Sequence, residues 1–350
     1  MAGKRLQKVT IKDIARMCKV STQTVSRVIN QRPDVSLETR TIIEKAIAEM
    51  GYQPSALARS LVQQRSYTLG VITAGLRYVG VAQTLNGITE QCEASGFALL
   101  LEELPRFDTL NIVPVIEALI ARQVEGIIFA ASELNENIKI VQLQLPAFCP
   151  PIIFLKSQPH PDHTIICIDN YGGARSAVEY LLSLGRRNIG LVSGPLEWLE
   201  ARQRKQGWED ALKAAGIEVC DQCWSQGNWS SSSGETAFIE LLEKYPQIDT
   251  VFCSNDQMAL GLLHHAHIIG KRIPEDLAVI CFDDLSESAY FTPALTTVKQ
   301  PLRELGILAV KTLLAQIEGG EPKHVGRVLT LPTELTVRDS TPKPNQFTQN

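Results

Sequence analysis

The fold of the N-terminal part is decided by residues 10–51, which read TIKDIARMCKVSTQTVSRVINQRPDVSLETRTIIEKAIAEMG. Thr10 precedes Asp13 by three residues, which is the spacing of a capping box at the start of a helix. Apolar side chains follow at helical spacing, at Ile11, Ile14, Ala15 and Cys18. The stretch therefore begins with a short amphipathic helix.

The same stretch predicts two further helices. After a break at residues 19–20, Ser21 caps a second helix, whose inward side chains are Val25, Val28 and Ile29. Ser36 caps a third helix that ends at Gly51 and carries one apolar stripe, made of Ile42, Ile43, Ala46, Ile47 and Met50. Two short helices joined by a tight turn form a helix-turn-helix, although the pattern also fits any three-helix bundle.

The distribution of charge points to a nucleic-acid partner for this part. Residues 1–66 contain 12 lysines and arginines but 5 acids, a net charge of +7, and because the whole chain carries −4, the remainder carries −11. The outer face of the second helix is polar, with Thr22, Gln23, Ser26 and Arg27. A basic head on an acidic body is typical of a DNA-binding module, and a solvated N-terminal arm is the alternative.

A third signal follows in residues 52–61, YQPSALARSL, in which the pair Pro54-Ser55 is followed by residues that read as a short helix. A helix of about two turns is too short to be stable alone in water. We expect it to form when a partner holds it, and DNA is the partner that the basic head suggests.

These motifs together resemble one known family. Residues 9–40, VTIKDIARMCKVSTQTVSRVINQRPDVSLETR, and residues 51–61, GYQPSALARSL, are similar to the DNA-binding headpiece and hinge of LacI/GalR-family transcriptional regulators. The resemblance continues to about residue 338 and so covers nearly the whole chain.

The resemblance implies DNA-binding roles for residues of the head. Thr22, Gln23 and Arg27 match the positions that contact base edges in the major groove, where glutamine can pair with adenine and arginine with guanine. The caps Thr10 and Ser21 would direct helix N-termini toward phosphates. Contacts to phosphate or sugar are expected from Ser26 and Asn30.

The hinge has its own implied roles. Leu61 matches the leucine that wedges into the minor groove at the operator centre and kinks the DNA, with Ala58 beside it. The alternative for Leu61 is a linker residue without such a role. Val62 stands where some purine-type members carry a basic residue, so minor-groove contacts at that position are not implied.

From residue 67 on, apolar strand-like runs alternate with helical stretches. The first series is 69–73, 97–101, 126–129 and 152–155, and the second is 189–192, 250–253 and 277–282. Such alternation predicts an α/β fold with two doubly wound subdomains, whose parallel sheets are covered on both faces. The resemblance implies a periplasmic-binding-protein-like fold, with chain crossovers near residues 168, 298 and 326.

The expected domain organisation has four parts. Residues 1–52 form the helix-turn-helix headpiece, and residues 53–66 form the hinge helix and linker. The effector-binding and dimerisation domain is 67–338, with an N-subdomain of about 67–168 and 299–326 and a C-subdomain of about 169–298 and 327–338. The polar residues 339–350 are expected to be a disordered tail.

Ligands of doubly wound folds bind beyond the carboxyl ends of the strands, here in the cleft between the subdomains. Four residues match positions that bind effector in sugar-responsive family members, namely Arg204, Trp229, Asn255 and Asp283. Gln300, after a crossover, is a further candidate. Lys156 stands where a sugar-binding relative has an acid, which hints at an anionic ligand such as a sugar acid. The alternatives are helix caps for Asn255 and Asp283 and a core position for Trp229.

Other function classes find little support. No G-x-S-x-G, G-x-x-x-x-G-K-[ST] or H-E-x-x-H motif occurs, so we expect neither an enzyme nor a cofactor. Cys220 and Cys223 have the spacing of half a zinc site, but no second pair completes it, so no metal is expected. No apolar run approaches the ~18–20 residues that span a bilayer. Without a signal peptide core, the chain is expected to be cytoplasmic, with reduced thiols and no membrane partner.

The sequence thus predicts a ligand-responsive transcriptional regulator that acts as a repressor. Its expected partners are double-stranded DNA with a pseudo-palindromic operator, a second copy of itself in a homodimer, and a small-molecule effector that is a sugar or sugar derivative. Induction and corepression are both compatible with the sequence. The alternatives are a regulator that responds to another metabolite, a sugar-binding component of a transport system, and an α/β enzyme with a DNA-binding head.

Overall fold

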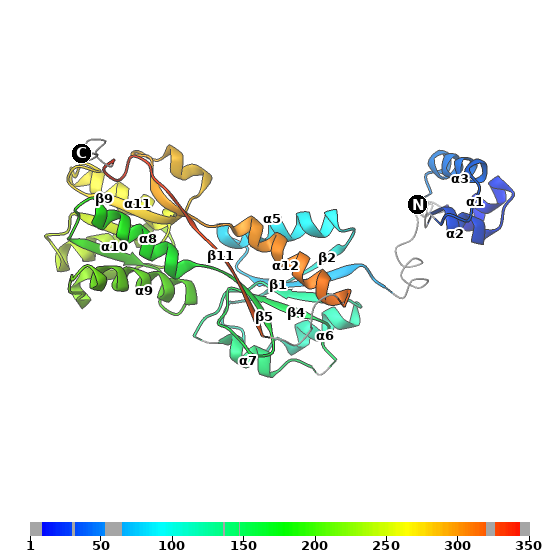
Figure 1. Cartoon of the computed structure of the whole chain (residues 1–350), viewed down its shortest axis with the longest axis horizontal. Coiled ribbons are helices and arrows are strands. Elements are labelled where there is room, and N and C mark those ends of the chain that lie inside the picture. The colour runs from blue at the N-terminus through cyan, green and yellow to red at the C-terminus, as the bar shows by residue number, and fades with distance from the viewer. Residues whose placement is uncertain are drawn as a thin grey trace, which may run out of the picture. The chain divides into compact units, whose positions relative to one another are not determined.

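The structure is a computed structural model that describes residues 9–29, 32–52, 65–135, 137–146, 148–319 and 326–343. The chain divides into two compact units, residues 1–67 and residues 68–350, which we call the head and the body (Figure 1). Residues 53–64 of the predicted hinge helix and linker (53–66) lie outside the described residues, as do residues 344–350 of the predicted tail.

The described part of the head consists of α1 (Ile11–Cys18), α2 (Thr22–Ile29) and α3 (Leu37–Met50). At the start of α1, the Asp13 carboxylate accepts hydrogen bonds from the amide of Thr10 at 3.0 Å and from its hydroxyl at 2.7 Å. The hydroxyl oxygens of Ser21 and Ser36 each accept a backbone N–H of the following turn, at 3.0 and 3.3 Å. The predicted caps therefore fix where the helices begin.

The three helices close around a small core, made of Ile14, Ala15, Val25, Val28, Ile43 and Ala46. The prediction is wrong for one residue of the apolar stripe, because the side chain of Ile42 is 50% exposed. Successive helical residues point about 100° apart, so Ile42 cannot share the inward direction of Ile43, which has no exposed surface.

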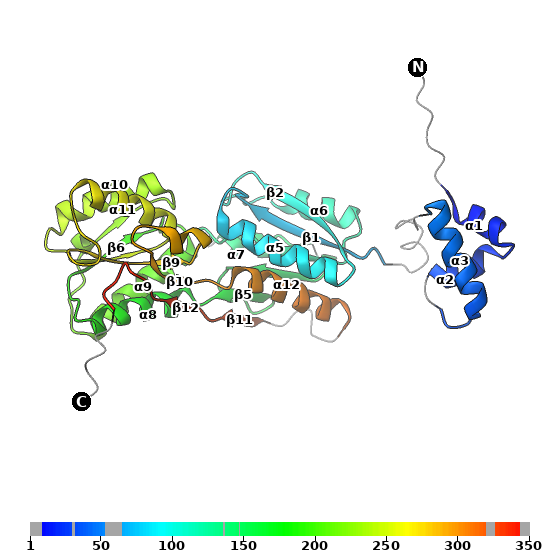
Figure 2. The same cartoon turned by 90° about the horizontal axis from the view of Figure 1, so that it is seen from above.

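The body contains two lobes, each built on a six-stranded sheet. The first lobe has the strand order β11-β5-β4-β3-β1-β2, and every pair is parallel. Its strands are β1 (Thr68–Ala74), β2 (Ala98–Leu104), β3 (Gly126–Phe129), β4 (Ile152–Leu155), β5 (Thr164–Ile168) and β11 (Arg327–Leu331). Helices α5 (Val79–Ala94) and α12 (Leu302–Ile317) lie side by side on one face (Figure 2), and α6 (Val113–Ala121) and α7 (Asn137–Leu143) cover the other.

The second lobe has the strand order β12-β10-β9-β8-β6-β7, and only β12 runs antiparallel to its neighbour in this described sheet. Its strands are β6 (Ile189–Ser193), β7 (Trp224–Gln226), β8 (Thr250–Cys253), β9 (Ala278–Asp283), β10 (Thr296–Lys299) and β12 (Glu334–Thr336). Helices α8 (Asn170–Ser183) and α9 (Leu199–Ala214) cover one face, and α10 (Ser231–Lys244) and α11 (Asp256–Ile268) cover the other. Two short 3-10 helices complete the lobe, η1 (Asp221–Cys223) and η2 (Ser286–Tyr290).

The predicted α/β fold with two doubly wound subdomains is confirmed. All seven predicted strand runs overlap observed strands, because continuous apolar segments are buried by helices on both faces. The strands that the sequence did not single out are β5, β7, β10, β11 and β12. Among them β7, β11 and β12 lie at sheet edges, where exposed residues interrupt the apolar run.

The third crossover lies later in the chain than expected. The sequence predicts that residues 327–331 belong to the C-subdomain, but they form β11, which pairs with β5 in the first lobe. The physical reason is the alternation of this strand, which packs Leu329 and Leu331 against the core of the first lobe. The chain passes to the second lobe between residue 331 and the start of β12 at residue 334.

The predicted disordered tail also begins too early, because Ser340 and Thr341 are buried in the second lobe. Ser340 Oγ donates to the carbonyl of Val279 at 2.6 Å and accepts from the amide of Thr296 at 2.8 Å. The hydroxyls of Thr341 and Thr296 are also hydrogen-bonded, at 2.9 Å. A polar segment is thus ordered by hydrogen bonds rather than by apolar burial.

Ser340→Ala is expected to lower the free energy of unfolding of the body by about 1–3 kcal/mol, because two buried backbone groups lose a hydrogen-bond partner. Urea unfolding measures the change. The matched control is Ser183→Ala at an exposed position of α8, where we expect a change below about 0.5 kcal/mol. Identical urea midpoints for Ser340→Ala and the unmodified protein would contradict the prediction.

The cysteines depart from expectation at one place. Cys220 and Cys223 form a disulfide, because η1 brings their Cα atoms to 5.5 Å, within the range that a disulfide bridges. The remaining cysteines are free thiols, at positions 18, 92, 149, 167, 253 and 281. Among the described residues, no group of three or more metal-binding side chains occurs. In the same part of the chain, no helix combines the length and apolar character needed to cross a membrane.

Candidate functional site

The head places its predicted base-contacting residues on the surface of α2. Thr22, Gln23 and Arg27 are exposed, whereas Ser26 is partly buried. The Arg27 guanidinium forms an ion pair with Asp34 at 3.2 Å, and such an exposed pair contributes little stability and is readily exchanged for another anion. The predicted phosphate contact Asn30 and the hinge residues Ala58 and Leu61 lie outside the described residues.

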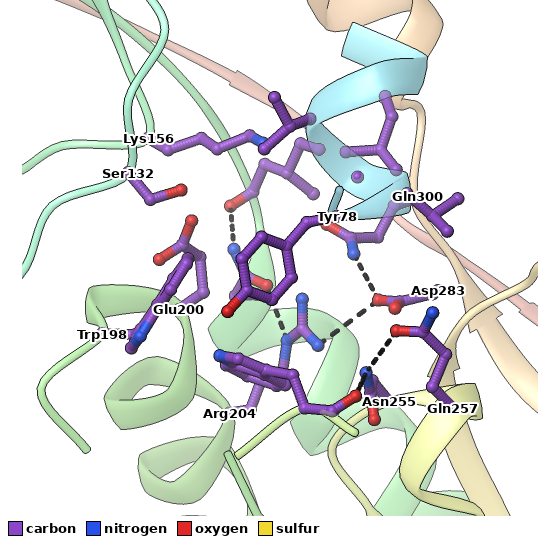
Figure 3. A pocket seen from close by; sticks show the side chains of 17 residues that line it. Tyr78, Ser132, Lys156, Trp198, Glu200, Arg204, Asn255, Gln257, Asp283 and Gln300 are labelled. Carbon is purple, nitrogen blue, oxygen red and sulfur yellow. Dashed lines mark hydrogen bonds and ion pairs between the residues drawn. The ribbon is translucent and has the colours of Figure 1, made fainter. Parts of the chain in front are cut away.

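The body has a pocket between its two lobes, with about 680 Å³ of space not filled by protein atoms, part of it open to solvent (Figure 3). The pocket brings together all six predicted effector residues, Lys156, Arg204, Trp229, Asn255, Asp283 and Gln300. Five of them stand at or just beyond the carboxyl end of a strand, and Arg204 projects from α9. This is the location that the doubly wound fold predicts.

Arg204 is held in place on several sides. Its Nε donates to Asn170 Oδ1 at 2.9 Å, and its Nη1 donates to the carbonyl of Ser254. The same Nη1 lies 3.4 Å from Asp283 Oδ1, and the guanidinium stacks 3.9 Å from the ring centre of Phe282. Burial lowers the pKa of Arg204, while Asp283 and Glu200 act in the opposite direction. The guanidinium stays charged and fixed in orientation.

Asp283 is the acceptor at the centre of this network. Gln300 Nε2 donates to Asp283 Oδ1 at 2.6 Å. Burial raises the pKa of Asp283 to about 7, although Arg204 acts to lower it. The residue has φ +124°, a conformation that side chains other than glycine rarely adopt and that is typical of ligand sites.

Asn255 and Trp229 serve the fold and the pocket together. Asn255 Oδ1 accepts the amide of Met258 at 2.9 Å and caps α11, while Asn255 Nδ2 donates to the carbonyl of Trp229 at 3.2 Å. The Trp229 ring belongs to the core of the second lobe and also lines the pocket. Its Nε1 has no hydrogen-bond partner among the described residues. The capping role predicted as an alternative for Asn255 and the core position predicted for Trp229 are therefore present, and they do not keep these two side chains from the pocket.

The sequence did not single out several other residues of the pocket, namely Tyr78, Ser132, Asn170, Trp198, Glu200 and Gln257. All six residues lie in segments that follow strands, and the sequence could have shown this. The sequence could not show which of these segments meet across the lobes. The Trp198 ring centre lies 5.9 Å from that of Trp229 and 5.8 Å from that of Tyr78, so aromatic side chains from both lobes meet beside the polar groups.

Besides the crossovers, the lobes are joined by a backbone clasp, which we define as residues 133–135 and 197–199. The amide of Leu199 donates to the carbonyl of Glu133 at 3.1 Å, and the amide of Asn135 donates to the carbonyl of Glu197 at 2.9 Å. Leu134 and Trp198 form an antiparallel bridge between these bonds. The clasp adjoins the pocket, because Trp198 and Glu200 line it.

Comparisons with known proteins match both units of the chain. A family of bacterial regulatory proteins, the lacI family, matches residues 10–55, and the periplasmic binding protein-like domain matches residues 178–341. The HTH-type transcriptional repressor PurR of Vibrio vulnificus is 34% identical over 341 residues, which cover 96% of this chain and 99% of the relative. PurR of Proteus mirabilis is 33% identical over 310 residues, covering 88% of this chain and 90% of the relative.

Solved structures extend the likeness to three dimensions. The Lac repressor dimer bound to operator and the anti-inducer ONPF is 31% identical, with a TM-score of 0.85, and the match covers 96% of this chain and 99% of that one. The complex of the transcriptional regulator CelR with cellobiose is 29% identical, with a TM-score of 0.70, covering 95% of this chain and 100% of that one.

Proposed function

The chain belongs to the LacI family of bacterial regulatory proteins and is a DNA-binding transcriptional repressor, and from this premise we propose that a small carbohydrate-like effector in the interlobe pocket controls its affinity for operator DNA. The observation that carries the proposal is the pocket itself, in which a guanidinium, carboxylates and amides surround aromatic rings (Figure 3). Hydroxyl groups donate and accept hydrogen bonds, so a sugar satisfies such a mixed set. The likeness to CelR, seen with cellobiose, supports this ligand class.

The proposed effector residues are Lys156, Arg204, Trp229, Asn255, Asp283 and Gln300. A second candidate is a repressor that responds to another metabolite, with the effector acting as corepressor. The observation that favours it is the name of the similar relatives, which are PurR repressors at 33–34% identity, whereas CelR is 29% identical. The similar relatives are transcriptional repressors and not enzymes, which agrees with the expectation that this chain is not an enzyme.

We further propose that two copies bind a pseudo-palindromic operator as a homodimer in the cytoplasm. The Lac repressor, which is similar over nearly the whole chain, binds its operator as a dimer. In this protein, α11 carries exposed apolar side chains eight residues apart at Leu260 and Ile268, and Tyr290 of η2 is 86% exposed. Exposed apolar surface of this kind is typical of subunit interfaces.

Each head would then read one half-site with Thr22, Gln23 and Arg27 in the major groove. Thr10, Ser21, Ser26 and Asn30 would contact the DNA backbone. Ala58 and Leu61 would enter the minor groove at the operator centre.

The hinge proposal has its own test. Leu61→Ala is expected to weaken operator binding by at least about tenfold, because an apolar wedge supports a DNA kink worth a few kcal/mol. Binding to a scrambled duplex, which is not kinked in this way, should change far less. Fluorescence anisotropy with both duplexes at one salt concentration measures the two affinities. Equal losses on the operator and on the scrambled duplex would refute the wedge role.

The function is tested by selecting fragments of genomic DNA with the purified full-length protein at near-physiological salt and sequencing what is retained. A palindrome upstream of genes for carbohydrate use is the expected result. The selection is repeated with sugars added, and release of the palindrome identifies an inducer, whereas tighter retention identifies a corepressor. The selection is also repeated with other metabolites, and retention that depends on salt but not on sequence under every one of these conditions would contradict operator recognition.

A further inference from the structure

Two charged side chains of the pocket differ from the rest because their charges act on nearby groups but no hydrogen bond or close ion pair joins them to another described residue. Lys156 comes from the end of β4 in the first lobe, and Glu200 comes from the first turn of α9 in the second. Lys156 Nζ forms no hydrogen bond or close ion pair with any residue that the structure describes. Burial lowers the pKa of Lys156, and the charges of Glu200 and Asp283 act against this shift without touching the ammonium. Glu200 is only 9% exposed, and its Oε2 has no partner among the described residues. By contrast, Arg204, Asp283 and Gln300 satisfy one another.

The Lys156 ammonium lies in a setting that favours an anion. Figure 3 shows its side chain reaching toward the first turn of α5, the helix that begins directly after Tyr78. This first turn lines the pocket with residues 78–81, and its N-cap Tyr78 makes no side-chain capping bond. A 16-residue helix carries partial positive charge and free N–H groups at this end. A lysine without a partner therefore stands beside a helix N-terminus, and both attract negative charge.

The loop that carries Lys156 is built to hold it there. The Glu133 carboxylate accepts hydrogen bonds from the amide of Gln158 at 2.8 Å and from its side chain at 2.9 Å. The backbone amide of Glu133 donates to the carbonyl of Lys156 at 3.4 Å. Lys156 has φ +54°, a left-handed conformation that the surrounding contacts maintain. The clasp residue Glu133 thus fixes the direction of the lysine.

From these observations we propose that the effector is a sugar that carries one anionic group, which is bound by Lys156 and the first turn of α5, while a neighbouring hydroxyl donates to Glu200. The inference rests on the proposed carbohydrate effector and names its chemical class. Leaving a buried charge without a partner costs free energy, and a charge-assisted hydrogen bond from the ligand recovers it. A neutral sugar would leave Lys156 with only the charges of Glu200 and Asp283, which it does not contact, so the pocket would favour a ligand that places an anion directly on the ammonium. Carboxylate and phosphate share this chemistry.

Calorimetry on the full-length protein tests the proposal with matched sets of ligands. Each common aldohexose is compared with its aldonic acid, its uronic acid and its 6-phosphate, so that only the anionic group differs. For one set, we expect an acid or the phosphate to bind at least about tenfold more tightly than the neutral sugar, which is the range of a charge-assisted contact. The acids and the phosphate identify which anion is the natural one. Raising the salt concentration should reduce the preference.

Variants assign the preference to the lysine. Lys156→Met, which keeps the length of the side chain, should weaken binding of the anion much more than binding of the neutral sugar, so that the ratio of the two affinities falls toward one. Lys156→Arg keeps the charge and should retain part of the preference for the anion. This variant therefore distinguishes loss of the charge from a disturbance of the fold. Lys311→Met, at an exposed position of α12, is the matched control and should behave as the unmodified protein. Glu200→Gln should weaken neutral and anionic sugars alike.

The outcomes separate the two claims. Tighter binding of the neutral sugar, or an equal loss for anion and neutral sugar in Lys156→Met, would overturn the anionic class while the carbohydrate effector stands. Absence of binding by every sugar, acid and phosphate would overturn the carbohydrate effector itself.

Discussion

Asp283→Ala is expected to abolish the effector response and to leave operator binding intact, because Asp283 lies in the pocket of the body and not in the head. The carboxylate is the shared partner of Arg204 and Gln300, so its loss removes one ligand-facing acceptor and leaves the buried guanidinium without its counter-charge. Truncating one partner of a buried charge pair costs 2–5 kcal/mol or more in binding, which corresponds to an affinity loss of about 30-fold to several thousandfold. Calorimetry with the identified effector and anisotropy with the operator measure the two affinities. Unchanged effector affinity would refute the assignment.

Asp283→Ala also has a signature in the pH dependence of stability. Because burial raises the pKa of Asp283 to about 7, the folded state binds a proton more tightly than the unfolded chain, in which an aspartate titrates near 3.9. The contribution of this residue to stability is therefore greatest below pH ~4 and is lost as the pH rises toward 7. The variant should show a flatter stability profile across that range. Glu287→Ala, an exposed acid of η2, should keep the profile of the unmodified protein.

The second large effect is expected from the double variant Gln23→Ala/Arg27→Ala. Both side chains are exposed on α2, so their removal should leave the head folded. Each bidentate base contact is worth about 1–3 kcal/mol of discrimination, so together they should reduce specific affinity by about 30-fold to 30,000-fold. Affinity for a scrambled duplex should fall much less, through the loss of one positive charge.

Anisotropy titrations with the operator and the scrambled duplex separate these effects. Lys45→Ala is the control, because Lys45 is an exposed cation of α3 that pairs with Glu49. It should leave the ratio of the two affinities unchanged. If the double variant lowers both affinities by the same factor, Gln23 and Arg27 do not read bases.

The sequence predicts most of the fold because the relevant signals are local. Caps at Thr10, Ser21 and Ser36 and the apolar runs of the central strands depend on neighbours within a few residues. The edge strand β11 was not predicted, because it contains exposed residues and its sequence therefore resembles that of a loop. Its assignment to the first lobe depends on pairing with β5, more than 150 residues away.

Only part of the pocket was predicted, again because local signals are visible in the sequence and long-range contacts are not. Positions after strand ends identified Asp283 and Asn255, because the carboxyl ends of parallel strands meet at one edge. Glu200 and Trp198 also follow a strand, but their place depends on contacts between lobes that no local pattern contains. The burial of Ser340 likewise depends on partners at distant positions in the chain.

The clasp between residues 133–135 and 197–199 has a kinetic consequence. Two backbone hydrogen bonds and the Leu134–Trp198 bridge join the lobes beside the pocket, so the lobes can separate there only when these bonds break. If a ligand needs this separation to pass, its exchange is limited by the rate at which the bonds break. At high ligand concentration the observed association rate should level off at that opening rate instead of rising linearly. A repressor limited in this way would report the presence of its effector with a delay that is set by the protein and not by diffusion.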